Sequence, residues 1–159
     1  MFKKIALAAL FIAPASAMAA TDTLTFDIEA SVPTARQYVK FQDVNFGGSQ
    51  QEMVWDRSTE QLQNISTTVL ARNTEGNITA YLQDTAELAH DSEPDNNIPL
   101  NVTLQGTALP VGSVSAVEVV SSTDAANEKN LNLVVSPNTS TYAGGDYTGT
   151  VTMIFDHGI

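Results

Sequence analysis

The chain has no cysteine among its 159 residues, so disulfide bonds and cysteine-ligated metal sites are excluded. Basic residues are also scarce, with seven lysines and arginines against eighteen aspartates and glutamates. This excess of negative charge opposes binding to the phosphates of nucleic acid and to anionic membranes. Aromatic residues make up only 7% of the chain. The composition therefore predicts no nucleic-acid partner and no disulfide framework.

Residues suited to catalysis or metal binding are few. His90 and His157 are the only histidines, and neither lies in a nucleophile or zinc motif. Residues 91–95 form an acidic stretch, but the stretch lacks the glycine and the final glutamate of a helix-loop calcium site. We therefore expect a solvated acidic loop, no cofactor, no metal and no catalytic residue. Trp55 fits either a sugar-stacking site or a partly buried position at a subunit or sheet boundary.

The first nineteen residues have the pattern of a secretory signal peptide. Lys3 and Lys4 precede an apolar run over residues 5–13, and Ala17-Met18-Ala19 supplies the small residues that place cleavage before Ala20. The apolar run is too short to span a bilayer. Without these residues, five basic residues remain against eighteen acidic ones, which is a net charge of −13.

Residues 24–32, which begin a few residues after this segment, alternate between apolar and polar side chains. This period of two is typical of a β-strand with one apolar face. The apolar face comprises Leu24, Phe26, Ile28, Ala30 and Val32. A strand so close to the end of a chain needs a groove to lie in, either in its own domain or in a neighbouring molecule.

Most of the remaining chain consists of short apolar or alternating segments separated by turn residues. The segments predicted as strands are residues 38–46, 65–71, 78–82, 100–104, 114–120, 131–135 and 147–155. Such a series is typical of an all-β sandwich. Residues 59–63 and 85–90 are the only candidates for helix, each of a turn or two.

The last strand has the pattern Gly-x-Tyr-x-Gly-x-Val, beginning at Gly145. Its residues on one face are Tyr147, Gly149, Val151, Met153 and Phe155. Together with the signal peptide, the N-terminal strand ending in Ala30-Ser31-Val32-Pro33 and the absence of cysteine, this pattern resembles the major pilin subunits of the alternate chaperone-usher class, the class 5 or alpha fimbriae of the colonisation-factor type. The final four residues, 156–159, have no counterpart in the pattern.

The resemblance implies an immunoglobulin-like β-sandwich that is incomplete and is completed by donor-strand exchange. Residues 1–19 would be the signal peptide, 20–33 the donor-strand extension and 34–159 the pilin domain. The C-terminal strand would contact the groove or a chaperone. The implied partners are identical pilin subunits, a periplasmic chaperone, an outer-membrane usher and a larger tip adhesin, and the implied location is a cell-surface fimbria reached through the periplasm. The alternative is a secreted, self-contained β-sandwich that binds a ligand or carbohydrate with its own N-terminal strand folded into its sheet.

Overall fold

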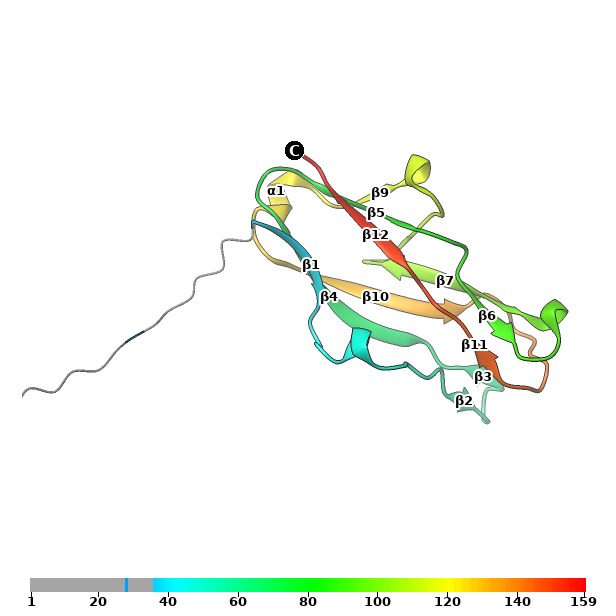
Figure 1. Ribbon diagram of the computed structural model, residues 1–159. Helices are drawn as coiled ribbons and strands as arrows, with labels where there is room; N and C mark the ends of the chain where they lie inside the picture. The colour runs from blue at the N-terminus through cyan, green and yellow to red at the C-terminus, as the bar shows by residue number, and fades with distance from the viewer. Residues whose placement is uncertain (1–27, 29–35) are drawn as a thin grey trace, which may run out of the picture. The chain divides into compact units, whose positions relative to one another are not determined.

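The computed structural model of the chain describes Ile28 and residues 36–159. These residues form two antiparallel sheets and a small separate hairpin (Figure 1). The larger sheet has the order β1 (Gln37–Phe41), β4 (Ile65–Asn73), β10 (Lys129–Pro137), β7 (Ile98–Leu104), β6 (Glu87–His90) and β11 (Tyr147–Thr148), with β8 (Thr107–Ala108) also paired to β7. The smaller sheet has the order β12 (Met153–His157), β5 (Ile78–Leu82) and β9 (Val117–Val120). The all-β sandwich predicted from the sequence is confirmed.

The hydrophobic core lies between the two sheets. Every second side chain of β5 is buried, and the same alternation appears in the second half of β4 and in β10. This alternation places one face of each strand inward because successive side chains point to opposite sides of a sheet. The core includes Val69, Ile78, Leu104, Val120, Leu131 and Leu133, each at most 5% exposed.

The last part of the chain runs antiparallel to residues 78–90. In the smaller sheet Met153 pairs with Leu82 and His157 with Ile78, whereas in the larger sheet Tyr147 pairs with His90. The chain therefore passes from one sheet to the other between Thr148 and Met153. The single C-terminal strand predicted over residues 147–155 is divided into two strands at this crossing.

Several predicted boundaries were wrong. Residues 85–90, a candidate helix, contain strand β6, and residues 59–63 contain β3 (Gln61–Leu62), which pairs with β2 (Trp55–Asp56). The first strand ends at Phe41 and is followed by the 3-10 turn η1 (Phe46–Gly48). The remaining short elements are η2 (Pro94–Asn96), η3 (Ser113–Ser115) and α1 (Ser122–Ala125). Within the described residues, no helix has the length and apolar character needed to cross a membrane.

Candidate functional site

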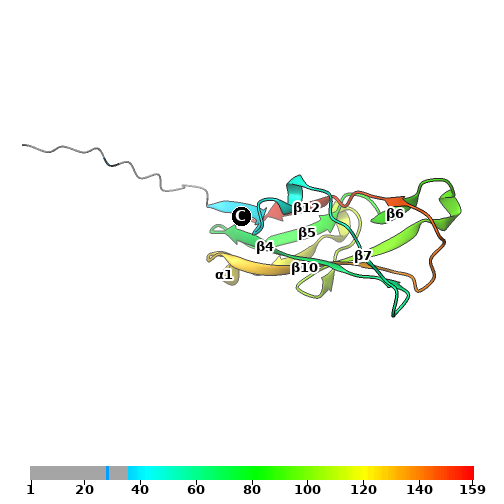
Figure 2. The ribbon, with the colours of Figure 1, turned by 90° about the horizontal axis from the view of Figure 1, so that it is seen from below.

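Two edge strands, β1 and β12, define the candidate site. Each lies at the end of its sheet, where β1 pairs with β4 alone and β12 pairs with β5 alone among the described strands. An edge strand leaves one row of backbone N–H and C=O groups without a strand partner. The two strands run in opposite directions, so the C-terminus and the first residues of β1 lie at the same end of the domain (Figure 1 and Figure 2).

An apolar groove of about 380 Å³ lies between these two edges. One wall comes from β1 and β4, and the other from β12 and the two residues before it. The residues that line the groove are Val39, Lys40, Phe41, Val69, Val151, Thr152, Met153 and Phe155. Most of the apolar ones are only partly buried, although they pack against the core. The groove thus exposes side chains that resemble core residues.

The structure places only part of the predicted C-terminal face in the groove. Val151, Met153 and Phe155 line it, as a continuous apolar face would require. Tyr147 lies elsewhere, because its ring packs edge-on against His90 at 4.9 Å and its hydroxyl donates to the Ala143 carbonyl at 2.8 Å. Gly149 is also outside the groove, where its backbone approaches the Glu87 carbonyl too closely for a side chain.

The predicted donor residues Leu24, Phe26, Ala30 and Val32 lie outside the described residues. Ile28, the fifth member of that face, is described and is 80% exposed.

The sequence did not indicate that β1 forms one wall of the groove. Val39 and Phe41 point into the groove because they pair with the inward-facing residues Ala71 and Val69 of β4. The Phe46 ring packs against Phe41 with 4.8 Å between ring centroids. The alternation of Val39 and Phe41 indicated a two-faced strand, but it carried no information about the strand that lies opposite.

The outer face of β1 is held to the rest of the domain by a polar contact. The Tyr38 hydroxyl donates a hydrogen bond to the Glu128 carboxylate. This bond raises the pKa of Tyr38, with smaller contributions from burial and from the negative charge of Glu128. The Lys40 ammonium lies 5.1 Å from the centroid of the same ring, within the range of a cation–π contact. These contacts hold β1 in place, with its opposite face toward the groove.

A buried asparagine holds the C-terminal end of β12. Asn73 is 0% exposed, and its side-chain amide donates to the carbonyls of Asn77 at 2.9 Å and Gly158 at 2.8 Å. The Asn73 side-chain oxygen accepts from the Glu75 amide at 3.0 Å. A Cβ atom on Gly76 would collide with the Gly158 carbonyl, so the β4–β5 turn and the chain end fit closely. Residues 156–159, which matched no expected pattern, therefore secure this strand.

His157 is the last residue of β12, and its side chain points inward. It pairs with the fully buried Ile78, and directly opposite residues of an antiparallel pair share one side of the sheet. Its Nδ1 atom is buried and has no hydrogen-bond partner among the described residues. Buried polar atoms in folded proteins are nearly always paired. The row of Val151, Met153 and Phe155 thus ends in a polar atom that lacks a hydrogen-bond partner among the described residues.

The other residues considered for function lie at the far end of the domain. His90 Nδ1 accepts from the backbone amides of Ser92 and Glu93, so this histidine orders the acidic loop. Within residues 36–159 no group of three or more potential metal ligands comes together. Trp55 is 43% exposed and packs edge-on against Tyr142 with 5.2 Å between ring centroids.

Comparison with solved structures identifies the fold. The chain is similar to the CooA pilin subunit from enterotoxigenic Escherichia coli, with a TM-score of 0.56 and 16% sequence identity, over 77% of this chain and 87% of that one. The open-edged sandwich is thus an immunoglobulin-like fold of the pilin type. A search of curated protein sequences finds no match. The model of the CS1 type fimbrial major subunit family matches residues 23–156, and the chain belongs to this family.

The protein is a structural subunit of a cell-surface fimbria, and its family is not a family of enzymes. A major subunit is the repeating unit of a fimbrial fibre.

Proposed function

We propose that this chain forms the shaft of a chaperone-usher fimbria by donor-strand exchange. In each contact, residues 20–33 of one subunit fill the groove between β1 and β12 of the next. The observation that carries this proposal is an apolar groove bordered on both sides by edge strands. A strand placed there would meet backbone partners along its edges and apolar side chains beneath it.

The N-terminal segment has the chemistry that the groove requires. Its face of Leu24, Phe26, Ile28, Ala30 and Val32 would cover partly buried residues such as Phe41 and Phe155. Burying the four large side chains contributes about 1.5–3 kcal/mol each, whereas ordering nine residues costs about 1–2 kcal/mol each. Because these terms are of similar size, the durability of the fibre depends on slow strand release as well as on affinity.

The same groove accounts for the other proposed partners. An open apolar edge promotes aggregation, so a periplasmic chaperone would cover it between export and assembly. The signal peptide of residues 1–19 would direct export, an outer-membrane usher would assemble the fibre, and a larger adhesin at its tip would bind host surfaces. These roles would divide the chain after residue 19, where the signal peptide ends, and after residue 33, where the donor-strand extension ends.

The test compares two versions of the domain. One begins at Thr34, and the other carries residues 20–33 after Ile159 through a flexible linker. We expect the fused protein to be a stable monomer and the truncated one to aggregate or to melt at a much lower temperature. A truncated protein that is monomeric and melts as high as the fused one would overturn the proposal and favour a self-contained binding module.

Two substitutions in the fused segment provide a matched control. Ile28→Asp places a charge against the apolar groove and should remove the stabilisation, because an unpaired buried charge is costly. Glu29→Ser changes the opposite face and should have an effect of about 0.5 kcal/mol or less. In the full-length chain, Ile28→Asp should likewise abolish fibres in electron micrographs, while Glu29→Ser retains them.

A further inference from the structure

The inward-facing row of β12, whose members Met153 and Phe155 line the groove, continues beyond it to a polar side chain. This polar residue distinguishes one direction along the groove from the other. His157 occupies the position after Phe155 in the inward row of β12, beside the turn that Asn73 holds. Its buried Nδ1 has no partner among the residues that the structure describes. An occupant of the groove that brought a hydrogen-bonding group to this end would satisfy that atom.

The donor segment carries one suitable group in the required row. The apolar face of residues 24–32 recurs at every second position, and the next position of that row toward the N-terminus is Asp22. A carboxylate accepts hydrogen bonds only, and a neutral or charged imidazole can donate one from Nδ1. Asp22 is therefore a polar residue at the end of the donor row, as His157 is at the end of the inward row of β12.

We infer that Asp22 of one subunit hydrogen-bonds to His157 of the next and thereby fixes the direction and register of the donor strand. This inference rests on the proposed strand exchange. The donor runs antiparallel to β12, with Leu24 opposite Phe155, Phe26 opposite Met153 and Ile28 opposite Val151.

Other registers lose this match. A slip of one residue would turn the apolar face of the donor away from the groove. A slip of two residues in one direction places Asp22 opposite Phe155, and in the other direction places Leu24 opposite His157. In a donor parallel to β12, Asp22 would lie at the opposite end of the groove from His157.

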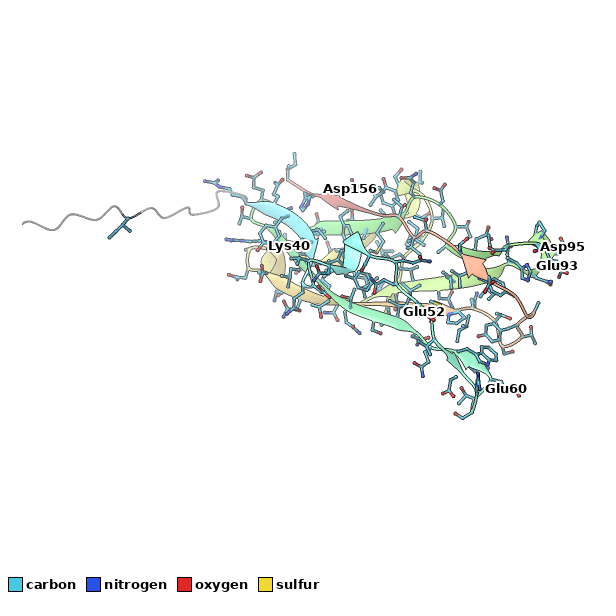
Figure 3. All side chains as sticks on the ribbon, turned by 60° about the horizontal axis from the view of Figure 1, so that its bottom comes forward. Lys40, Glu52, Glu60, Glu93, Asp95 and Asp156 are labelled. Atoms are coloured by element: carbon cyan, nitrogen blue, oxygen red, sulfur yellow. The ribbon has the colours of Figure 1, made fainter. Side chains whose placement is uncertain are left out.

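The strand ends near the start of β1 carry charges of both signs. Arg36, Arg72 and Lys129 lie there, since Tyr38 pairs with Arg72 and Ala71 with Lys129, and so do Glu75, Asp124 and Glu128, which contact Gln37, Lys129 and Tyr38. The far end of the domain is acidic. Figure 3 shows Glu60, Glu93 and Asp95 there, at the opposite end from Lys40. Two further carboxylates, Asp91 and Asp146, lie on strand-connecting segments joined by a backbone hydrogen bond of 3.1 Å.

The direction of the donor decides which of these ends meet. Arg36 follows Val32 by four residues, which span at most about 14 Å when extended. In the antiparallel direction the donor leaves the groove toward β11 and the acidic loop, so the start of β1 of one subunit approaches the acidic end of the next. In the parallel direction the starts of β1 of two subunits would meet.

Cysteine cross-linking in assembled fibres tests the register, and the absence of native cysteine removes background. Asp27 and Thr152 are opposite each other in the proposed register, so the double variant Asp27→Cys, Thr152→Cys should form disulfide-linked multimers. The pairs Asp27→Cys, Thr150→Cys and Asp27→Cys, Ile154→Cys represent the registers shifted by two residues and should cross-link several-fold less. Stronger cross-linking by a shifted pair would overturn the register while strand exchange stands. A further set of cysteine pairs is designed for a parallel donor. If neither this set nor the three pairs above cross-links subunits, the proposal of strand exchange is overturned.

A second measurement tests the two polar residues. Asp22→Leu lies in the donor segment and leaves every side chain of the acceptor domain unchanged, so its effect is not one of domain unfolding. It should reduce cross-linking of the 27/152 pair and raise that of a shifted pair. The exchanged variant Asp22→His, His157→Asp should restore the 27/152 pattern. Unchanged cross-linking in Asp22→Leu would show that the apolar residues alone set the register.

Discussion

The two sides of the sandwich are built from similar residues and differ in exposure. On the closed side, away from the groove, Leu104 and Leu133 are at most 2% exposed, because each lies on a strand with neighbours on both edges. On the open side, Phe41, Met153 and Phe155 recur at every second position on inward faces in the same way but are only partly buried. The difference follows from the missing neighbour strand and not from the amino-acid composition of either side.

This contrast separates the parts of the domain that depend on a partner from those that do not. The closed side has its backbone pairing within one chain. The open side has the side chains of a core but lacks the strand that would cover them. Substitutions on the closed side should therefore act equally with and without a donor strand, and substitutions on the open side should act mainly when the donor is present.

The largest effect is expected at Leu104, which is 0% exposed on the inner face of β7. Leu104→Ala removes buried methyl groups and leaves a cavity, so it should lower the free energy of unfolding by about 2–5 kcal/mol. Urea unfolding of the domain fused to its donor segment measures this loss. Val114→Ala, at a side chain that is 101% exposed, is the matched control and should change the unfolding midpoint little. A loss at Leu104 below 1 kcal/mol would show that the core is not where the structure places it.

An intermediate effect is expected at Phe155 on the open side. Phe155→Ala should lower the free energy of unfolding of the fused domain by about 1.5–3 kcal/mol, the value for burial of a large apolar side chain. The same substitution should cost less in the domain without a donor, because the ring is only partly buried there. The measurement is the unfolding midpoint of each form. Equal losses in the two forms would mean that the donor does not cover Phe155.

Alternation in the sequence was sufficient to predict most of the closed side. Strands β4, β5, β7 and β10 all contain the segments predicted for them, because each has one buried face and a clear period of two. Prediction was weaker where that period is short or interrupted. Residues 85–90 have too few apolar positions to distinguish strand from helix, and β6 forms there because residues 87 and 88 pair with the start of β7.

The open side could be predicted only in part. The alternation of Val151, Met153 and Phe155 indicated a half-buried strand. That this strand faces β1 across a groove depends on two non-local pairings, β1 with β4 and β12 with β5. Asn73 and His157 carried no signal at all, because a buried asparagine and a terminal histidine acquire their roles only when the β4–β5 turn meets the end of the chain.

The smallest effect is expected on the closed side at Asp124, beside the start of β10. Hydrogen bonding from the Lys129 ammonium at 2.8 Å, then from the Ser121 hydroxyl at 3.0 Å, and the positive charge of Lys129 lower the pKa of this exposed carboxyl. A carboxyl whose pKa is lower in the folded state stabilises the fold above its ordinary pKa of 3.8, and loses that effect as the pH falls through the lowered value. The difference in melting temperature between the native chain and Asp124→Asn should thus be greatest near neutral pH and should shrink in acid.

A comparison of the domain with and without its fused donor segment tests whether this effect is confined to the closed side. The pH-dependent difference should be the same in the fused domain and in the domain without a donor, because Asp124 does not line the groove between β1 and β12. Asp156→Asn, at an exposed position on β12, controls for the loss of one negative charge. Melting curves between pH 2 and pH 7 on the two forms provide the test. If the effect of Asp124→Asn depended on the donor, the two sides of the sandwich would be coupled, and the division between partner-dependent and independent regions would not hold.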